Sequence, residues 1–576
     1  MGVVLYIYEL VVPIISVGKA LLFFIFKVVV PISKKSYQGA DSMQEVVVFI
    51  LAMAPILWLI IALSGLKMPG YKACPIALVF SIIIAGFFWK MNALNLVTAG
   101  LEGAVMAIWP ICLVIVAAIF TYNICIHSHS METIKQMLTG VSNDKRILVL
   151  IIAWCFGGFM EGMAGFGTAV AIPASMLCGL GFDPIFAAVA CLIADTTPTT
   201  FGSIGIPVVT ISKVTGLDVL PLSYYATLQL LPLVILTPFI LVILTGKSLK
   251  ALKGVWHITL ASGLAFILPE LLAAKFMGAE LPVILGSICA LIVTVFLAKS
   301  SKGEVPKEYQ LIAKQEKENH LSETINNSKI VSKDGQKVES VISFREGAKA
   351  WSPFILIFIF LVVTSKAVPV LHNALSSIQT SVQIYQGKGG SETTFCWILT
   401  PGVLILIAAF IGAKIQRIAP KEAAKILWDS TKQMSKTILT IISIMATAKI
   451  MSYSGMIADI AAVFVLLTGN FYPLVAPFIA SIGSFVTGSA TSSSVLFGGL
   501  QQQTAKTLGM NELWLTASNT VGACAGKIIS PQSIAIAVAA IGKAGSESQI
   551  MKKAVKFYLL FIILMGLICY FGLKML

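Results

Sequence analysis

The feature that most constrains this chain is a succession of apolar runs, each long enough to cross a membrane as a helix. A spanning helix needs about 20 predominantly apolar residues. The first run is the weakest candidate, because it contains Glu9, Lys19 and Lys27, and a tilted position at the membrane interface is its alternative. The runs lie at 8–31, 45–65, 73–89, 103–125, 147–160, 226–245, 254–274, 281–298, 352–371, 395–413, 437–451, 456–480 and 555–575.

The composition leaves few other classes open. Of 576 residues, 57% are apolar and 12% are charged, whereas a soluble domain carries about 45–50% and 25%. This excludes a soluble enzyme, a disordered chain and a collagen-like fibre. A membrane β-barrel is disfavoured, because its strands alternate apolar and polar residues. The sequence predicts an all-α, polytopic integral membrane protein with roughly 12–14 transmembrane helices.

The net charge of +15 indicates topology rather than nucleic-acid binding, because cytoplasmic loops of membrane proteins are rich in Lys and Arg. The segment 299–351 is polar and has no apolar period, so we expect a solvated cytoplasmic linker. It divides the chain into membrane halves 1–298 and 352–576. Two spans separate it from each basic stretch, which places all three on one side. The basic stretches contain Lys247, Lys250 and Lys253, and Lys414, Arg417, Lys421, Lys425, Lys432 and Lys436.

Cysteine and histidine usage predicts no metal site. The ten cysteines lie mostly inside apolar runs and form no CxxC pair, so we interpret them as buried small residues. His127 and His129 form an HxH pair at the end of a span, and we do not interpret this pair as a metal site. We expect no cofactor, and the N-terminus lacks the pattern of a cleaved signal peptide.

Two regions, 158–207 and 483–531, interrupt the apolar pattern with clusters of Gly, Ser, Thr and Pro. Irregular backbone is tolerated in a membrane only where protein buries it or where it lines a cavity. One copy lies in each half, which is typical of secondary transporters whose binding site lies at broken helices of internal repeats. The regions share Phe159-x-x-Gly162 with Phe485-x-x-Gly488, Leu180-Gly181 with Leu508-Gly509, Asp195-Thr196 with Asn519-Thr520, and Gly202-x4-Pro207 with Gly526-x4-Pro531.

Three of the charged residues in these regions are candidates for function. Glu161 and Asp195 are carboxylates in apolar surroundings, a costly placement that marks a proton relay, an ion site or a buried pair. We expect Glu161, and secondly Asp195, to carry a coupling proton. Lys527 is a counter-charge for a substrate carboxylate or for either acid, and the sequence does not separate these roles.

Small polar residues in the same regions form the predicted substrate site. Hydroxyls, an amide and backbone N–H groups at helix N-termini suit a carboxylate ligand. The alternative is that they only permit close packing of helices. The predicted substrate-binding residues are Gly165, Thr168, Thr196, Thr197, Thr487, Ser489, Thr491, Ser492, Ser493, Ser518, Asn519 and Thr520.

At these positions the sequence resembles the lactate permease family of bacterial secondary transporters. The resemblance implies proton-coupled uptake of L-lactate, and often D-lactate and glycolate, across the inner membrane, with a fold like that of the ion-transporter superfamily. It covers most of the chain outside 299–351. The motifs that carry it are GGFMEGMAGFGTAVAIPASMLCGLGFDPIFAAV, FGSIGIPV, TGSATSSSVLFGGLQ and GKIISPQSIAIA.

Some positions depart from the family pattern. Asp195 stands where Asn is usual, and Ala490 where Asp is usual. The triplet Ser518-Asn519-Thr520 is similar to a signature of divalent anion/sodium symporters. The alternative function is therefore a sodium-coupled carrier of another small organic anion, such as a dicarboxylate.

A membrane-embedded enzyme or receptor subunit is disfavoured, because no catalytic constellation lies outside the membrane. The expected partners are a lactate-like anion, the coupling proton and the lipid bilayer, without nucleic acid. The sequence leaves a homo-oligomer open.

Overall fold

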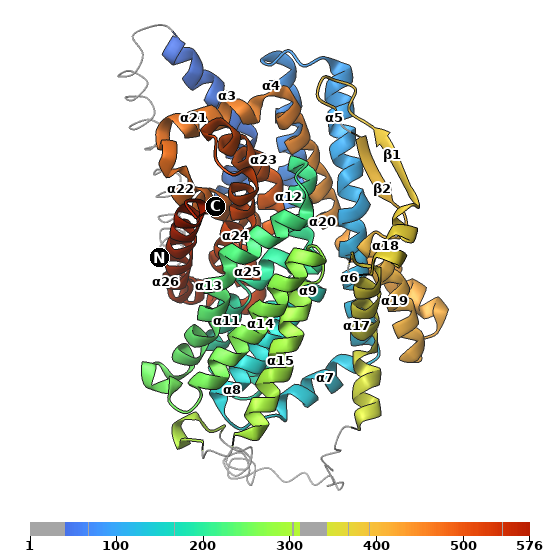
Figure 1. Ribbon diagram of the computed structural model, residues 1–576, viewed down its shortest axis with the longest axis vertical. Coiled ribbons are helices and arrows are strands. Elements are labelled where there is room, and N and C mark those ends of the chain that lie inside the picture. The colour runs from blue at the N-terminus through green and yellow to red at the C-terminus, as the bar shows by residue number, and fades with distance from the viewer. Residues whose placement is uncertain are drawn as a thin grey trace.

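The computed structural model describes residues 41–66, 68–165, 167–301, 305–311, 343–366, 368–390, 392–543 and 545–575. The first apolar run, 8–31, and the middle of the predicted linker, 312–342, lie outside the described residues. The described chain is an assembly of roughly parallel and antiparallel helices, with one small β-hairpin at its side (Figure 1).

The helices of the first half run from α3 to α15. The stretches η3 (Ala107–Cys112) and η4 (Leu150–Phe156) join neighbouring helices into the single spans Ala93–His127 and Lys145–Met163. The helices are α3 (Asp41–Ile60), α4 (Gly70–Phe87), α5 (Ala93–Met106), α6 (Leu113–His127), α7 (Ser130–Thr139), α8 (Lys145–Val149), α9 (Gly157–Met163), α10 (Thr168–Gly179), α11 (Pro184–Ala194), α12 (Gly202–Thr215), α13 (Val219–Gly246), α14 (Trp256–Phe276) and α15 (Pro282–Ser300).

The second half runs from α17 to α26. Its β-hairpin, which the all-α prediction missed, pairs β1 with β2 in antiparallel register from Gln379↔Cys396 to Gln383↔Glu392. The elements are α17 (Phe344–Thr364), α18 (Pro369–Ser376), β1 (Gln379–Gln383), β2 (Glu392–Cys396), α19 (Pro401–Ile415), α20 (Pro420–Ser454), α21 (Met456–Thr468), α22 (Tyr472–Thr487), α23 (Ala490–Leu508), α24 (Glu512–Ile529), α25 (Pro531–Ile541) and α26 (Glu547–Leu573).

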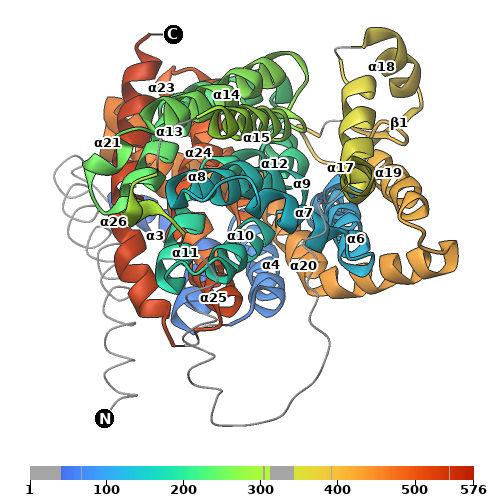
Figure 2. The same ribbon diagram turned by 90° about the horizontal axis from the view of Figure 1, so that it is seen from below.

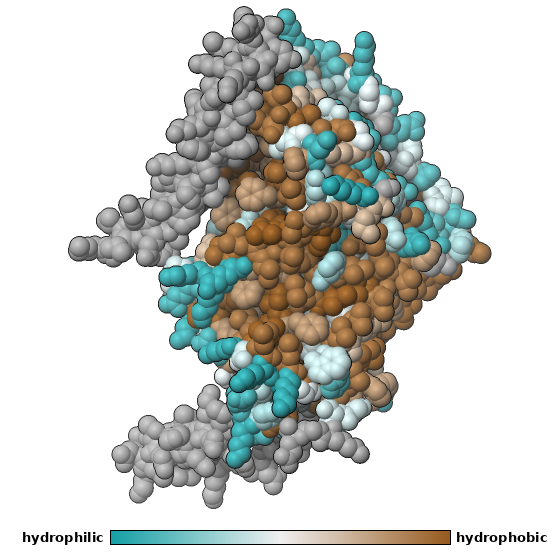
Figure 3. All heavy atoms as spheres, turned by 60° about the vertical axis from the view of Figure 1, so that its left-hand side comes forward, coloured by the Kyte–Doolittle hydropathy of each residue, from teal (hydrophilic) through white to brown (hydrophobic). Residues whose placement is uncertain are grey.

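The polytopic membrane architecture is confirmed. Ten described helices are long and apolar enough to cross a membrane, or up to twelve if each of two bent pairs counts as one span. A broad apolar band covers the side of the molecule between hydrophilic ends (Figure 3). The upper end of the predicted range of 12–14 spans is not reached in the described residues, because several apolar runs belong to bent or interrupted helices.

The polar linker is narrower than the predicted 299–351. Helix α15 continues to Ser300, and α17 begins at Phe344 with a capping box between Ser343 and Glu346. Residues 305–311 fold back onto the start of α8, where the Leu311 amide donates to the Asn143 carbonyl at 3.0 Å. The Arg146 guanidinium lies 4.1 Å from the centre of the Tyr309 ring. These contacts explain why a segment without an apolar period is still ordered there.

Both interrupted regions fold into the same pair of motifs. Each contains a helical hairpin, α9–α10 or α22–α23, followed by a bent pair. The bend is 57° between Pro184–Ala194 and Pro198–Thr215, and 48° between Glu512–Ile529 and Pro531–Ile541. In both cases a proline follows the first helix of the pair, where it cannot continue the hydrogen-bond ladder.

The two motifs exchange partners across the centre of the molecule. Helix α12 of the first repeat packs on α23 of the second, and α25 of the second packs on α10 of the first. This reciprocal packing brings the two bends together in the core. The hairpin β1–β2 with α17, α18 and α19 forms a lobe to one side (Figure 2), while α4, α5, α6 and α20 pack on one another between that lobe and the repeats.

Candidate functional site

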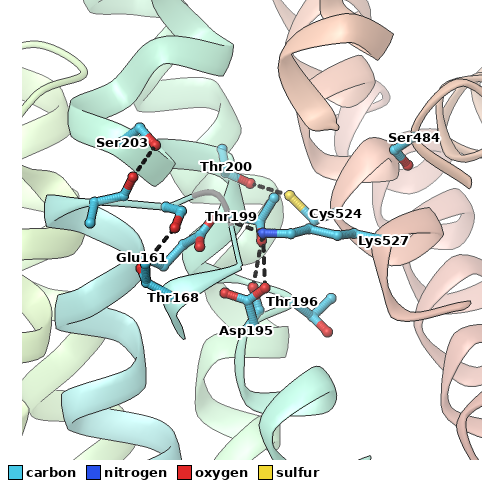
Figure 4. Close-up of polar contacts among 12 residues, drawn as sticks. Glu161, Thr168, Asp195, Thr196, Thr199, Thr200, Ser203, Ser484, Cys524 and Lys527 are labelled. Atoms are coloured by element: carbon cyan, nitrogen blue, oxygen red, sulfur yellow. Dashed lines mark hydrogen bonds and ion pairs between the residues drawn. The ribbon is translucent and has the colours of Figure 1, made fainter. Parts of the chain in front are cut away.

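The three charged residues predicted from sequence meet at the centre of the molecule. The Lys527 ammonium, from α24 of the second repeat, donates to Glu161 Oε1 at 2.8 Å and forms an ion pair with Asp195 Oδ2 at 2.9 Å. It also donates to Thr199 Oγ1 at 3.0 Å. All three partners belong to the first repeat (Figure 4). The contacts therefore join the two repeats at their bends.

This ionic cluster carries more acid than base. Glu161, Asp195 and Lys527 are all buried. Glu161 Oε2 and Asp195 Oδ1 have no hydrogen-bond partner among the described residues. With both acids ionised the three side chains sum to −1, an uncompensated charge that is costly inside a membrane protein. A proton on either carboxyl makes the cluster neutral, so the cluster is chemically suited to bind and release one proton.

The backbone of the first repeat is shaped around Glu161. A Cβ atom at Gly202 would lie 2.5 Å from Glu161 Oε1, so only glycine leaves room for the carboxylate. The next residues, Ser203 and Ile204, have left-handed φ angles of 47° and 59°, which are rare for residues with side chains. The Ser203 hydroxyl donates to the Ala164 carbonyl at 3.0 Å and ties this strained segment to the hairpin α9–α10.

The repeats also meet at equivalent positions. Thr200 and Cys524 differ by 324 residues, the offset that relates Asp195 to Asn519. Their Oγ1 and Sγ atoms lie 2.8 Å apart, so matched positions of the two repeats are in direct contact. Under the same offset, Lys527 corresponds to Ser203. The charged cluster therefore has a neutral counterpart in the other half.

A cavity of about 560 Å³ adjoins the cluster. Glu161, Thr199 and Lys527 form part of its polar wall, and Asp195 lies behind them. The N-terminus of α23 contributes more of that wall. A largely apolar wall faces it from outside the repeats, and it includes Leu63, Cys74, Ile115 and Ile441.

The predicted substrate-binding residues divide into two groups. Four of them line the cavity, at the turn where α22 ends and α23 begins: Thr487, Ser489, Thr491 and Ser492. The Ser489 hydroxyl caps α23 by accepting from the Ser492 amide at 3.2 Å. This turn places the first, unpaired N–H groups of α23 beside the cavity.

The other predicted residues do not line the cavity. Their hydroxyls bond to carbonyls of their own or neighbouring helices, as in Ser518 to Leu515 at 2.7 Å and Ser493 to Ala480 at 2.6 Å. At these positions the structure fits the alternative interpretation, in which small polar residues permit close packing of helices. Thr197 and Asn519 are exceptions, because the Thr197 hydroxyl and both atoms of the buried Asn519 amide lack a partner among the described residues. The group comprises Gly165, Thr168, Thr196, Thr197, Ser493, Ser518, Asn519 and Thr520.

The structure adds cavity residues that the sequence prediction did not include. Gln532 follows the break between α24 and α25, and its side chain lies over Gly488, where a Cβ atom would be 2.3 Å from Gln532 Oε1. Its amide makes no hydrogen bond to any other described residue. The signal was present in sequence, because Gln532 directly follows the matched Gly526-x4-Pro531 motif. The additional polar or small lining residues from the two repeats are Gly167, Thr199, Gly202, Ser203, Gly488, Ala490, Gln532 and Ser533.

Comparison with known proteins gives a consistent family. The family model described as L-lactate permease matches residues 48–576. An L-lactate permease of Streptococcus iniae is 46% identical over 82% of this chain and 94% of its own length. A glycolate permease of Escherichia coli K12 is 33% identical over 90% of this chain and 94% of its own length.

Among solved structures, Neisseria gonorrhoeae MtrF is 14% identical, with a TM-score of 0.46, over 86% of this chain and 94% of that chain. The family match and the curated relatives span nearly the whole chain, including both repeats and the ionic cluster. The chain therefore belongs to the L-lactate permease family and is a multi-pass membrane transporter rather than an enzyme.

Proposed function

We propose that this protein is a proton-coupled importer of L-lactate and related short 2-hydroxy monocarboxylates, including D-lactate and glycolate, in the bacterial inner membrane. The observation that carries the proposal is the sharing of one ammonium, Lys527, between two buried carboxylates at the wall of a cavity. The named substrates of the curated relatives, lactate and glycolate, are both 2-hydroxy monocarboxylates.

Charge balance links proton binding to anion binding at this cluster. When Glu161 and Asp195 are both ionised, they occupy Lys527 and repel an incoming carboxylate. A proton on Glu161, which lines the cavity, weakens its pairing with Lys527 and frees the ammonium for the substrate carboxylate. The empty cluster carries −1, and the cluster with one proton and one anion also carries −1. The proposed cycle is therefore electroneutral at this site.

The rest of the cavity suits the remainder of such a substrate. The unpaired amide of Gln532 and the N-terminus of α23 offer hydrogen bonds to a 2-hydroxyl group or to the carboxylate. The opposite wall offers apolar contact for a methyl group, with Ile115 and Ile441 among its residues. A site built to hydrogen-bond a hydroxyl group discriminates strongly against analogues that lack it.

The position of the cavity opening supports alternating access. Its lining includes Lys436, which lies in the basic stretch that the sequence predicts to be cytoplasmic. We therefore assign this structure to an inward-open state. Movement of the paired repeats against α4, α6 and α20 would transfer the site to the other side of the membrane, in an elevator-like manner.

Uptake of labelled L-lactate into proteoliposomes tests the proposal. We expect accumulation under an inward proton gradient, and no additional accumulation when a sodium gradient is imposed at constant pH. Sodium-dependent accumulation without a proton requirement would favour the alternative, a sodium-coupled carrier of another organic anion. Absence of lactate uptake and of lactate exchange would refute the proposed substrate.

A further inference from the structure

A further buried acid, Glu270, lies in α14 without a cation or a hydrogen-bond partner among the described residues. Its side chain is completely buried. Neither of its carboxyl oxygens has a hydrogen-bond partner among the described residues. The other buried acids among the described residues differ, because each contacts a cation: Glu161 and Asp195 contact Lys527, Glu102 contacts Lys449, and Asp144 contacts Arg146.

The elements packed around Glu270 supply no counter-charge. Helix α14 packs on α13 and α15, and its Phe266 and Ser262 side chains also reach α9 and η4. No ion pair joins Glu270 to another described residue. The titratable groups on these elements are Tyr224 and Tyr225 on α13, Cys289 and Lys299 on α15, Cys155 on η4, Glu161 on α9, and His257 and Lys275 on α14 itself.

These surroundings fix the protonation state. An ionised carboxylate without hydrogen bonds or a cation is too costly in a buried, membrane-embedded position. Glu270 therefore holds a proton in this conformation. The group is a carboxylic acid at a depth where most side chains are apolar, and the proposed transport cycle does not yet use it.

Its place in the fold connects it with the ionic cluster. Phe266, one turn earlier, contacts the α9 backbone, where a Cβ atom at Gly158 would lie 3.0 Å from the Phe266 ring and 3.5 Å from Pro198. Residues four apart lie on the same face of a helix, so Glu270 faces α9 and the unwound segment after α11. That segment carries its own unsatisfied buried atoms, Asp195 Oδ1 and Thr197 Oγ1. Glu270 thus lies on the side of α14 that faces the first repeat.

We propose that Glu270 is a second proton-binding site of the carrier, loaded in the inward-open state. The inference rests on the proposed proton-coupled function. When the repeats move, the Glu270 carboxyl releases one proton to water that enters with the movement, and a carboxylate of the cluster takes up one proton. Glu270 becomes ionised and the receiving acid becomes neutral, so the total charge does not change.

Glu270→Gln tests this inference, because glutamine is close in shape to a protonated glutamic acid. We expect the variant to fold with an unchanged melting temperature. Proton-driven accumulation of lactate in proteoliposomes should fall about tenfold, and its dependence on external pH should flatten. The KM for lactate exchange should change less than twofold. The matched control is Glu280→Gln, a glutamate in the loop after the same helix, which should keep the wild-type pH profile.

Two outcomes of the Glu270→Gln experiment would overturn the inference. If Glu270→Gln accumulates lactate with the wild-type pH profile, Glu270 is only a buried structural acid. If Glu270→Gln does not fold, Glu270 is not a neutral carboxyl, since glutamine would have replaced it. Glu270→Asp, which keeps a titratable group, should retain the pH dependence at a lower rate. A failure of the proposed function is distinguishable, because wild-type liposomes would then show no lactate exchange.

Discussion

Two of the buried ion clusters among the described residues pair lysine with acids but differ in structure. In the first, Lys527 serves two acids, Glu161 and Asp195. In the second, Lys449 of α20 pairs with one acid, Glu102 of α5, at 2.9 Å. The first lines a cavity in part, and the second does not. The two clusters therefore differ in charge balance and in access.

The second cluster is saturated with hydrogen bonds. Besides Lys449, Glu102 accepts from the Tyr453 hydroxyl at 2.8 Å and from the Tyr385 amide at 3.2 Å. The Tyr385 and Tyr453 rings stack at 3.8 Å, which fixes the segment after β1 against α20. A Cβ atom at Gly103 would lie 2.6 Å from Ala446 Cα, so α5 and α20 are in close contact here.

The contrast shows that a buried ion cluster can have either a fixed or a variable protonation state. A neutral, fully bonded pair has no reason to change its protonation and acts as a structural joint. An unbalanced cluster with unsatisfied oxygens beside a cavity can accept a proton and an anion. Burial alone does not separate the two cases, but the ratio of acids to bases does.

Removal of the shared cation should have the largest effect. Lys527→Met leaves two buried carboxylates together, and loss of one partner from a buried ion pair costs about 3–5 kcal/mol. We expect initial lactate uptake to fall about a hundredfold or more, measured in proteoliposomes at equal protein content. Lys506→Met, which removes a half-exposed cation from α23, should stay near wild type. Uptake by Lys527→Met above a tenth of wild type would show that the cation is not required for substrate binding.

In the second cluster, removal of both charged partners should be tolerated, whereas removal of Lys449 alone should not. Lys449→Met should destabilise the fold by about 3–5 kcal/mol, seen as a lower melting temperature in detergent. The double variant Glu102→Gln/Lys449→Met should regain most of that loss and transport lactate, because it leaves no buried charge.

The matched test on the first cluster is Lys527→Met/Glu161→Gln/Asp195→Asn. This triple variant should regain stability but not uptake. Equal behaviour of the two sets of variants, either both active or both inactive, would contradict the distinction between a structural joint and a transport site.

Much of the ionic cluster around Lys527 could be predicted from sequence, because a charge inside an apolar run is rare and therefore informative. Glu161, Asp195 and Lys527 stood out on this basis, and the repeat motifs located both bends. The structural joint was missed. Glu102 borders the start of the run 103–125, and Lys449 lies inside 437–451, but nothing local indicates that these two residues meet across two helices.

The hydroxyl-rich positions were only partly predictable, for a geometric reason. Helical spacing shows which residues share a face, but the packing of the other repeat decides which face borders the cavity. Thr487 and Ser489 lie at the turn before α23 and face the cavity, whereas Ser518 and Thr520 lie inside α24 and bond to its own carbonyls. The β-hairpin was missed because strands β1 and β2 are short and β1 is exposed throughout.

Glu161→Gln should separate proton coupling from anion binding. The amide cannot release a proton, so Lys527 stays available to the anion at every pH. We expect accumulation driven by an inward proton gradient to fall about tenfold, while lactate exchange remains measurable. Wild-type uptake should rise as external pH falls, and uptake by the variant should be flat over the same range.

Asp195→Asn is the comparison for this variant, because Asp195 pairs with the same ammonium but does not line the cavity. It should slow uptake and keep the pH dependence. If Asp195→Asn flattens the pH profile and Glu161→Gln does not, the two acids have exchanged roles.

Gln532→Ala should have the smallest effect and test recognition of the hydroxyl group. Its free amide can form one neutral hydrogen bond to a 2-hydroxyl, worth about 0.5–1.5 kcal/mol. Competition by propionate, which lacks this group, should therefore improve up to about tenfold relative to lactate. The measurement is inhibition of labelled lactate exchange by unlabelled propionate and glycolate. Gln503→Ala, on α23 outside the cavity, is the control. An unchanged ratio in Gln532→Ala would assign hydroxyl recognition to the N-terminus of α23, since that turn supplies the other unpaired donors on the polar wall.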